Sequence, residues 1–170
     1  TGLILGWRTS FNPFSFKPSW DEVAELGTAD QLAKLAEPEF KARLVSEDSV
    51  FPESDVQILA ELMANAFTLQ YELGDGFNYE PSEEQSIAYL AGQAGVSGAE
   101  YAYDLMMSDG GNGFIYFPLL NYADGNLDFL EPILQSADCI NSLSDGGAHC
   151  GTICDAASPT FMLQHWVRDR

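Results

Sequence analysis

The chain is poor in basic residues. Its 170 residues contain 7 Lys and Arg against 26 Asp and Glu, which gives a formal net charge of −19. No stretch of the sequence gathers basic side chains into a stripe. Nucleic acids and anionic lipid surfaces bind proteins through clustered Lys and Arg, because those side chains neutralise the phosphate groups and release their counterions. We therefore expect neither a nucleic-acid partner nor a membrane partner.

Cysteine is scarce and unevenly placed. The three cysteines are Cys139, Cys150 and Cys154, an odd number confined to one region. A disulfide framework needs paired cysteines, so this pattern predicts free thiols and a reducing, cytoplasmic location. No apolar run approaches the roughly 20 residues of a membrane-spanning helix, and no signal-like segment opens the sequence.

The sequence also lacks the short motifs of several enzyme classes. Walker A, GxGxxG, GxSxG and HExxH are all absent. A small zinc module built on Cys150, Cys154 and His165 is a minor alternative, because structural zinc sites normally show two CxxC-like pairs or a closely spaced His pair, and neither occurs here. Packing as buried free thiols is the more frequent role of such cysteines. For His165 the more frequent role is helix packing or capping.

Both ends of the sequence stop within an element. Thr1 leads directly into the apolar run 2–7, and the last residues, FMLQHWVRDR, end on charges without a C-cap glycine. No repeat, linker or low-complexity tract interrupts the chain. We therefore interpret residues 1–170 as a single unit cut at both ends from a longer protein, with a processed mature protein as the alternative.

Several local signals predict elements in the first two thirds of the chain. The run 2–7 reads as a buried strand, followed by a loop that its phenylalanines pin to a core. Ser19 is expected to cap a helix, Pro38 to open one and Ser82 to cap another. Between them, FTLQYEL leans toward a strand.

The last third places the chain in the α/β class. GFIYFPLL (113–120) is an apolar run typical of a strand buried on both faces, LDFLEPILQSA (127–137) predicts a short helix, and DCINSL (138–143) predicts a second buried strand. This order spans about 30 residues, the length of one βαβ crossover. Such crossovers build parallel sheets, whose ligand sites lie where the strands end.

Two polar clusters follow the two predicted strands. NYADGN brings Asn121, Tyr122 and Asp124 after the first, and SDGGAHCGTICD brings Asp145 and His149 after the second. Neighbouring parallel strands would place them at one edge of the sheet. Asp145 would emerge from an apolar wall, where burial raises its proton affinity enough for it to exchange a proton with water near neutral pH. An aspartate that only starts a glycine turn is the commoner role of Asp-Gly-Gly.

These residues carry a resemblance to a known family. The stretches NYADGN, SDGGAHCGTICDAASPT and FMLQHWVRDR resemble the C-terminal part of D-aminoacylases, the N-acyl-D-amino-acid deacylases of the amidohydrolase superfamily. Upstream, LILGWRTSFNPF, FKARLVSED, YEPSEEQSIAYLAGQAG and AYDLMM resemble the same family in the same order. The similarity therefore spans nearly the whole chain, and its two polar signatures are the specific part.

The resemblance implies the last βα units of a TIM (β/α)₈ barrel, with one or two divalent metal ions, usually zinc, at the C-terminal end of the strands. The implied activity is hydrolysis of the amide of a small-molecule N-acyl-D-amino acid, or of a related C–N bond, by water that the metal activates. Asp145 matches the aspartate that accepts the proton of that water and delivers it to the leaving amine. Asn121, Tyr122 and His149 are expected to contact the substrate.

The metal ligands of that superfamily are missing from this sequence. Its His-x-His pair and its later ligand histidines do not occur, because His149 and His165 are the only histidines. The resemblance therefore implies metal ligands upstream, with Asp145 beside the metal and the rest of the barrel as a partner. We expect the 170 residues alone to be inactive. The alternatives are a degenerate relative and a non-catalytic acidic binding or scaffold domain.

Overall fold

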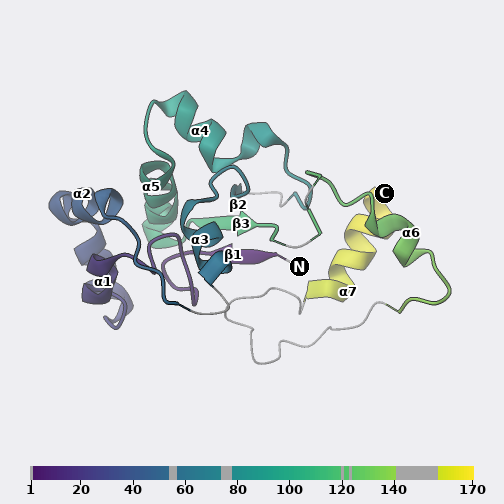
Figure 1. The fold of residues 1–170 in the computed structure, drawn as a ribbon, viewed down its shortest axis with the longest axis horizontal. Coiled ribbons are helices and arrows are strands. Elements are labelled where there is room, and N and C mark those ends of the chain that lie inside the picture. Colours follow the sequence, from purple (N-terminus) through teal and green to yellow (C-terminus); the bar gives the residue numbers. More distant parts are fainter. Residues whose placement is uncertain (1, 54–56, 74–77, 120, 123, 141–156) are drawn as a thin grey trace.

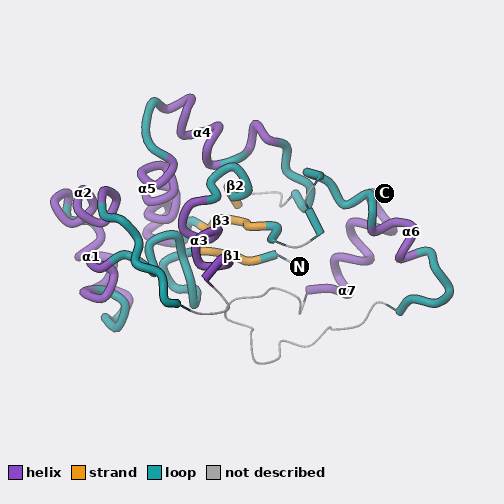
Figure 2. Tube along the Cα trace, in the orientation of Figure 1, coloured by secondary structure: helices purple, strands orange, loops and turns teal. Residues whose placement is uncertain are grey.

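The computed structural model describes residues 2–53, 57–73, 78–119, 121–122, 124–140 and 157–170 (Figure 1). Helices surround a small sheet (Figures 1 and 2). The α-helices are α1 (Thr28–Leu35), α2 (Pro38–Ser46), α3 (Gln57–Asn65), α4 (Ile87–Ala94), α5 (Gly98–Gly111), α6 (Leu130–Leu134) and α7 (Ser158–Phe161). Two 3₁₀-helices, η1 (Pro18–Glu22) and η2 (Glu83–Gln85), and a π-helix, η4 (Met162–Asp169), complete the helical elements.

The sheet has three short strands in the order β1-β3-β2. They are β1 (Leu3–Leu5), β2 (Tyr71–Leu73) and β3 (Phe114–Phe117), and β3 pairs with each of the others in an antiparallel register. The mixed α/β class predicted from the sequence is therefore confirmed. The parallel sheet expected from a βαβ crossover does not appear among the described strands, which do not specifically show part of a barrel.

The apolar run at β3 is buried on one face only. Ile115 and Phe117 are buried, whereas Phe114 and Tyr116 are half-buried, which corrects the expectation of burial on both faces. The glycines that flank β1 explain the aromatic residues on the second face. A Cβ atom at Gly2 would collide with the ring of Tyr116, and one at Gly6 would lie 2.7 Å from the ring of Phe114. The two rings therefore pack directly on glycine backbone.

The core lies between the sheet and helices α1, α2 and α5. The indole of Trp7 stacks on Phe14 with ring centroids 5.5 Å apart, and both rings meet Tyr103 edge-on. Tyr103 is buried, and its hydroxyl donates to the carbonyl of Leu35 at 2.5 Å. The prediction that phenylalanines pin the loop after β1 is confirmed at Phe14, which is fully buried.

Helix starts follow the sequence signals in part. Pro38 opens α2 as predicted. Ser82 forms a capping box with Gln85, but it starts only the short η2, and Ser86 caps α4. Ser19 was expected to cap a helix, but the structure places it inside η1, with its backbone N–H donating to the carboxylate of Glu47 at 2.9 Å. A long-range acceptor replaces the local cap.

The second strand predicted for the crossover, residues 138–143, is described only in part, and that part is not a strand. Asp138, Cys139 and Ile140 are not in a strand, and Ile140 is 89% exposed. The rest of that segment, residues 141–143, lies outside the described residues. A short apolar run does not by itself distinguish a buried strand from an exposed turn, which is why the prediction failed here.

Among the described residues, no helix has the length and apolar character that a bilayer crossing requires.

The close packing of Gly113 against α5 gives a direct stability test. A Cβ atom at this position would collide with the backbone carbonyl of Leu105, so Gly113→Ala should lower the free energy of unfolding by about 2–3 kcal/mol. Gly92 is the matched control, because it lies on the exposed side of α4 with nothing within 4 Å of the added atom. Gly92→Ala should stabilise the protein by about 0.5–1 kcal/mol in urea unfolding. Equal effects of the two substitutions would contradict the packing described here.

Candidate functional site

The predicted site residues divide into described and undescribed positions. Asn121, Tyr122 and Asp124 belong to the described chain, whereas Asp145 and His149 fall in the segment 141–156, outside the described residues. Cys150 and Cys154 lie in the same segment. The roles assigned to these four residues therefore stay predictions. Asn121, Tyr122 and Asp124 lie in the loop after β3, here called the 121–128 loop (residues 121, 122 and 124–128).

Tyr122 anchors the first end of this loop. The side chain is 4% exposed, its ring meets Tyr71 of β2 edge-on at 6.3 Å, and its hydroxyl donates to the carbonyl of Pro81 at 2.9 Å. Burial raises the pKa of Tyr122 above its ordinary value, and the neighbouring phenol of Tyr71 adds to the rise. Tyr122 is therefore a neutral donor throughout the physiological range.

Asn121 and Asp124, on either side of Tyr122 in the sequence, are both exposed. Asn121 has a backbone φ of +66°, a left-handed conformation that Asn adopts more readily than most residues. Because the hydroxyl of Tyr122 already has an acceptor in Pro81, the polar groups that this part of the loop presents to solvent are those of Asn121 and Asp124. A direct substrate contact by Tyr122 stays a prediction.

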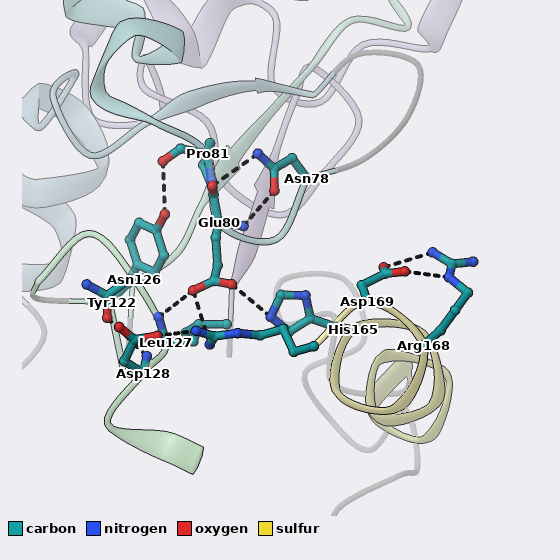
Figure 3. Close-up of polar contacts among 11 residues, drawn as sticks. Asn78, Glu80, Pro81, Tyr122, Asn126, Leu127, Asp128, His165, Arg168 and Asp169 are labelled. Atoms are coloured by element: carbon teal, nitrogen blue, oxygen red, sulfur yellow. Dashed lines mark hydrogen bonds and ion pairs between the residues drawn. The ribbon is translucent and has the colours of Figure 1, made fainter.

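Glu80 holds the second end of the loop. One oxygen of its carboxylate, Oε1, accepts the backbone N–H of Leu127 at 2.7 Å (Figure 3). Leu127 is itself buried beside Tyr71 and Tyr122. The adjacent residues Glu80 and Pro81 thus grip the loop at two points, one through a side-chain carboxylate and one through a backbone carbonyl.

The second oxygen of Glu80 faces η4, here called the C-terminal helix. Oε2 lies 3.0 Å from Nε2 of His165, a contact that is an ion pair only when the imidazole is protonated. The imidazole is 7% exposed and stacks on Phe161 with centroids 5.1 Å apart. Helix packing, which we expected for His165, is confirmed. Arg170 then bridges Glu80, at 3.5 Å, to the carboxylate of Asp128.

The electrostatics at His165 oppose its protonation. Burial lowers the pKa of His165 below its ordinary value, because a desolvated imidazolium is unfavourable. The Glu80 carboxylate offsets part of this effect, and Arg170 adds to it. His165 is therefore a neutral packing residue near pH 7.

The described residues contain no group of three or more His, Cys, Asp or Glu side chains that could hold a metal ion. His165 faces Glu80 and not a thiol, and Cys139 is an exposed free cysteine. The zinc module on Cys150, Cys154 and His165 stays untested, because both of its cysteines lie outside the described residues.

Comparisons with known proteins give no further guide. No family model, curated protein or solved structure matches the chain.

Glu80 and Pro81 are the residues that sequence reasoning missed. Both precede the helix-capping Ser82, so YEPSEEQ reads as a helix start with exposed acids. Their partners lie 41 and 47 residues further along the chain, and no local pattern indicates such contacts. A glutamate directly before a proline and outside the helical turn was the only signal present.

Acid should destabilise the protein through His165. Its pKa is lower in the folded state, so the unfolded chain binds more protons below about pH 6.5. The stabilising contribution of the neutral imidazole is complete above that pH and is lost as the pH falls toward the folded pKa. The free energy of urea unfolding should therefore decrease between about pH 7.5 and 5.5, a window above the ordinary carboxylate range. His165→Gln should flatten this decrease, and an equal slope in both proteins would contradict the assignment.

Proposed function

We propose that this chain supplies the general acid/base and part of the substrate-binding surface of an amidohydrolase that acts on N-acyl-D-amino acids or related C–N bonds. The observation that carries the proposal is the pair of polar signatures, NYADGN and SDGGAHCGTICD, with their resemblance to D-aminoacylases. The structure adds that the first signature lies in the loop after β3, which is held at Tyr122 and at Leu127, with Asn121 and Asp124 exposed. A fastened loop with exposed polar groups suits substrate binding, because little order has to be created when the ligand arrives.

Asp145 carries the proton chemistry in this proposal. A water oxygen forms a bond to the amide carbon, and its proton passes to the Asp145 carboxylate. The same proton then moves to the amide nitrogen as the C–N bond breaks, so that a neutral amine leaves and Asp145 returns to its ionised form. In this proposal Asn121, Tyr122 and His149 contact the substrate, and Tyr122 also anchors the loop.

The described residues do not supply the donor set of the divalent metal that the resemblance implies. Among them no cluster of three metal-ligating side chains occurs, and the whole sequence has two histidines. Following the resemblance, we assign the zinc or other divalent ion to ligands upstream of these residues. In this proposal the chain forms the last βα units of a barrel, its partner is the rest of that barrel, and its location is cytoplasmic.

One observation favours a second candidate function. The described sheet is antiparallel, whereas the strands of a (β/α)₈ barrel are parallel. A non-catalytic acidic binding or scaffold domain, or a degenerate relative of the hydrolases, would be free of that constraint. It would bind no stoichiometric metal and would hydrolyse no N-acyl-D-amino acid in any length of the gene product.

The test is hydrolysis by the full-length gene product supplied with Zn²⁺. We expect release of the free amino acid from N-acetyl-D-amino acids, and a loss in kcat/KM of about 10²–10⁴-fold in Asp145→Asn, the range of general acid–base catalysis. Asp138→Asn is the matched control, because Asp138 is exposed and lies seven positions earlier in the chain. The control should keep the wild-type rate.

Two outcomes would decide against the proposal. Full activity in Asp145→Asn would remove this residue from the mechanism. No hydrolysis of any N-acyl-D-amino acid by the zinc-loaded, folded full-length protein would favour the non-catalytic alternative.

A further inference from the structure

The geometry points to Glu80 as a positioning residue that ties the C-terminal helix to the 121–128 loop and so sets where that loop presents Asn121 and Asp124. This inference rests on the proposed function in one respect, namely that the loop contacts substrate. The connection that Glu80 makes between the helix and the loop, here called the tie, consists of contacts among described residues, and it can be measured without an enzymatic assay.

The two carboxylate oxygens of Glu80 serve different segments. Oε1 accepts the N–H of Leu127 at 2.7 Å, and Oε2 lies 3.0 Å from the imidazole of His165 (Figure 3). The two partners are 38 positions apart in the chain, and each is buried. A carboxylate carries two oxygens on one rigid plane, so Glu80 reaches both partners at once. The Glu80 carboxylate therefore links the position of the helix to that of the loop.

A second tie runs parallel to the first. The guanidinium of Arg170 lies 3.5 Å from Oε1 of Glu80 and also pairs with Asp128 of the loop. It sits over the ring of Trp166 at 5.1 Å, which fixes it to the end of η4. The backbone N–H of Arg170 donates to the carbonyl of His165 at 2.9 Å, so the two helix-side partners of Glu80 move together.

The donors and charges around Glu80 stabilise its carboxylate. The side chain is 20% exposed, and a carboxylate with so little water is stabilised by donors and by nearby cations. The charged or titratable groups that face this cluster include His165, Asp169 and Arg170 at the C-terminal end. Asp128 and Tyr122 face it from the loop, Glu131 lies near Arg170, and the ring of Tyr79 lies 5.6 Å from that of His165. Burial keeps His165 uncharged near pH 7, so Arg170 is the cation that balances Glu80 there.

The first experiment measures the tie in the 170-residue chain, using amide hydrogen exchange and NMR titration of the imidazole. In Glu80→Ala, the Leu127 amide should exchange about tenfold faster or more, because its acceptor is gone. In Glu80→Gln, the amide oxygen still accepts from Leu127, so exchange there should stay near wild type. The pKa of His165 should nevertheless fall, because the negative charge that raised it has been removed.

Glu84→Ala is the matched control, since Glu84 lies four positions away with an exposed side chain. It should change neither readout. The proposal is overturned if Glu80→Ala leaves Leu127 exchange at the control value, or if Glu80→Gln leaves the pKa of His165 unchanged. Should Glu80→Ala fail to fold, the Glu80→Gln titration still decides the matter.

The second experiment separates the tie from the proposed function by steady-state kinetics of the full-length protein. Glu80→Ala should raise KM several-fold with a smaller change in kcat, and Glu80→Gln should restore most of the loss. Unchanged KM in a folded Glu80→Ala protein would overturn the positioning role. If the wild-type protein hydrolyses no N-acyl-D-amino acid, the proposed function fails while the exchange and titration results still test the tie.

Discussion

The contact between the Glu80–Pro81 dipeptide and the 121–128 loop is the constraint on which the rest of the site depends. Pro81 accepts the hydroxyl of Tyr122, and Glu80 accepts the N–H of Leu127, so the loop is fastened at both ends. Tyr71 of β2 packs against the same tyrosine and connects this fastening to the sheet. The other oxygen of Glu80 reaches the C-terminal helix. The 121–128 loop, the sheet and the C-terminal helix are thereby connected through the Glu80–Pro81 dipeptide. This dipeptide supplies the two acceptors that the buried Tyr122 hydroxyl and the Leu127 amide require.

Two of the seven basic residues, Lys17 and Arg170, lie where one charge contacts several partners. Lys17 is 8% exposed and donates to the carbonyls of Val45 and Glu47, at 3.0 and 2.7 Å, which caps the C-terminal end of α2. Burial lowers the pKa of Lys17, although the charges of Glu47 and Asp48 counteract it. Surface pairs such as Lys41 with Asp104 contribute about 0–1 kcal/mol each. The buried lysine and the bridging Arg170 therefore matter more than the number of ion pairs.

Local patterns in the sequence predicted some helix starts and the positions of three strands, but not how the strands pair. Pro38 and Ser82 predicted helix starts that the structure contains, because caps act within one or two turns. Strand pairing was not predictable, because β1 and β3 are more than 100 residues apart and an apolar run carries no information on direction. Ser19 and Glu80 were misread for the same reason. Their partners, Glu47 and Leu127, are distant in sequence. Of the candidate site, the position of the polar loop after β3 was predicted, whereas its anchors were not.

The most direct test of the shared anchor is a double-mutant cycle between Tyr122→Phe and Glu80→Ala, with the free energy of urea unfolding as the readout. Both side chains hold the same short loop to the same dipeptide, so removing one bond should reduce what the other contributes. The account predicts an interaction energy of about 0.5 kcal/mol or more between the two substitutions. Effects that add to within about 0.3 kcal/mol would show that the two bonds act independently, and would contradict the account.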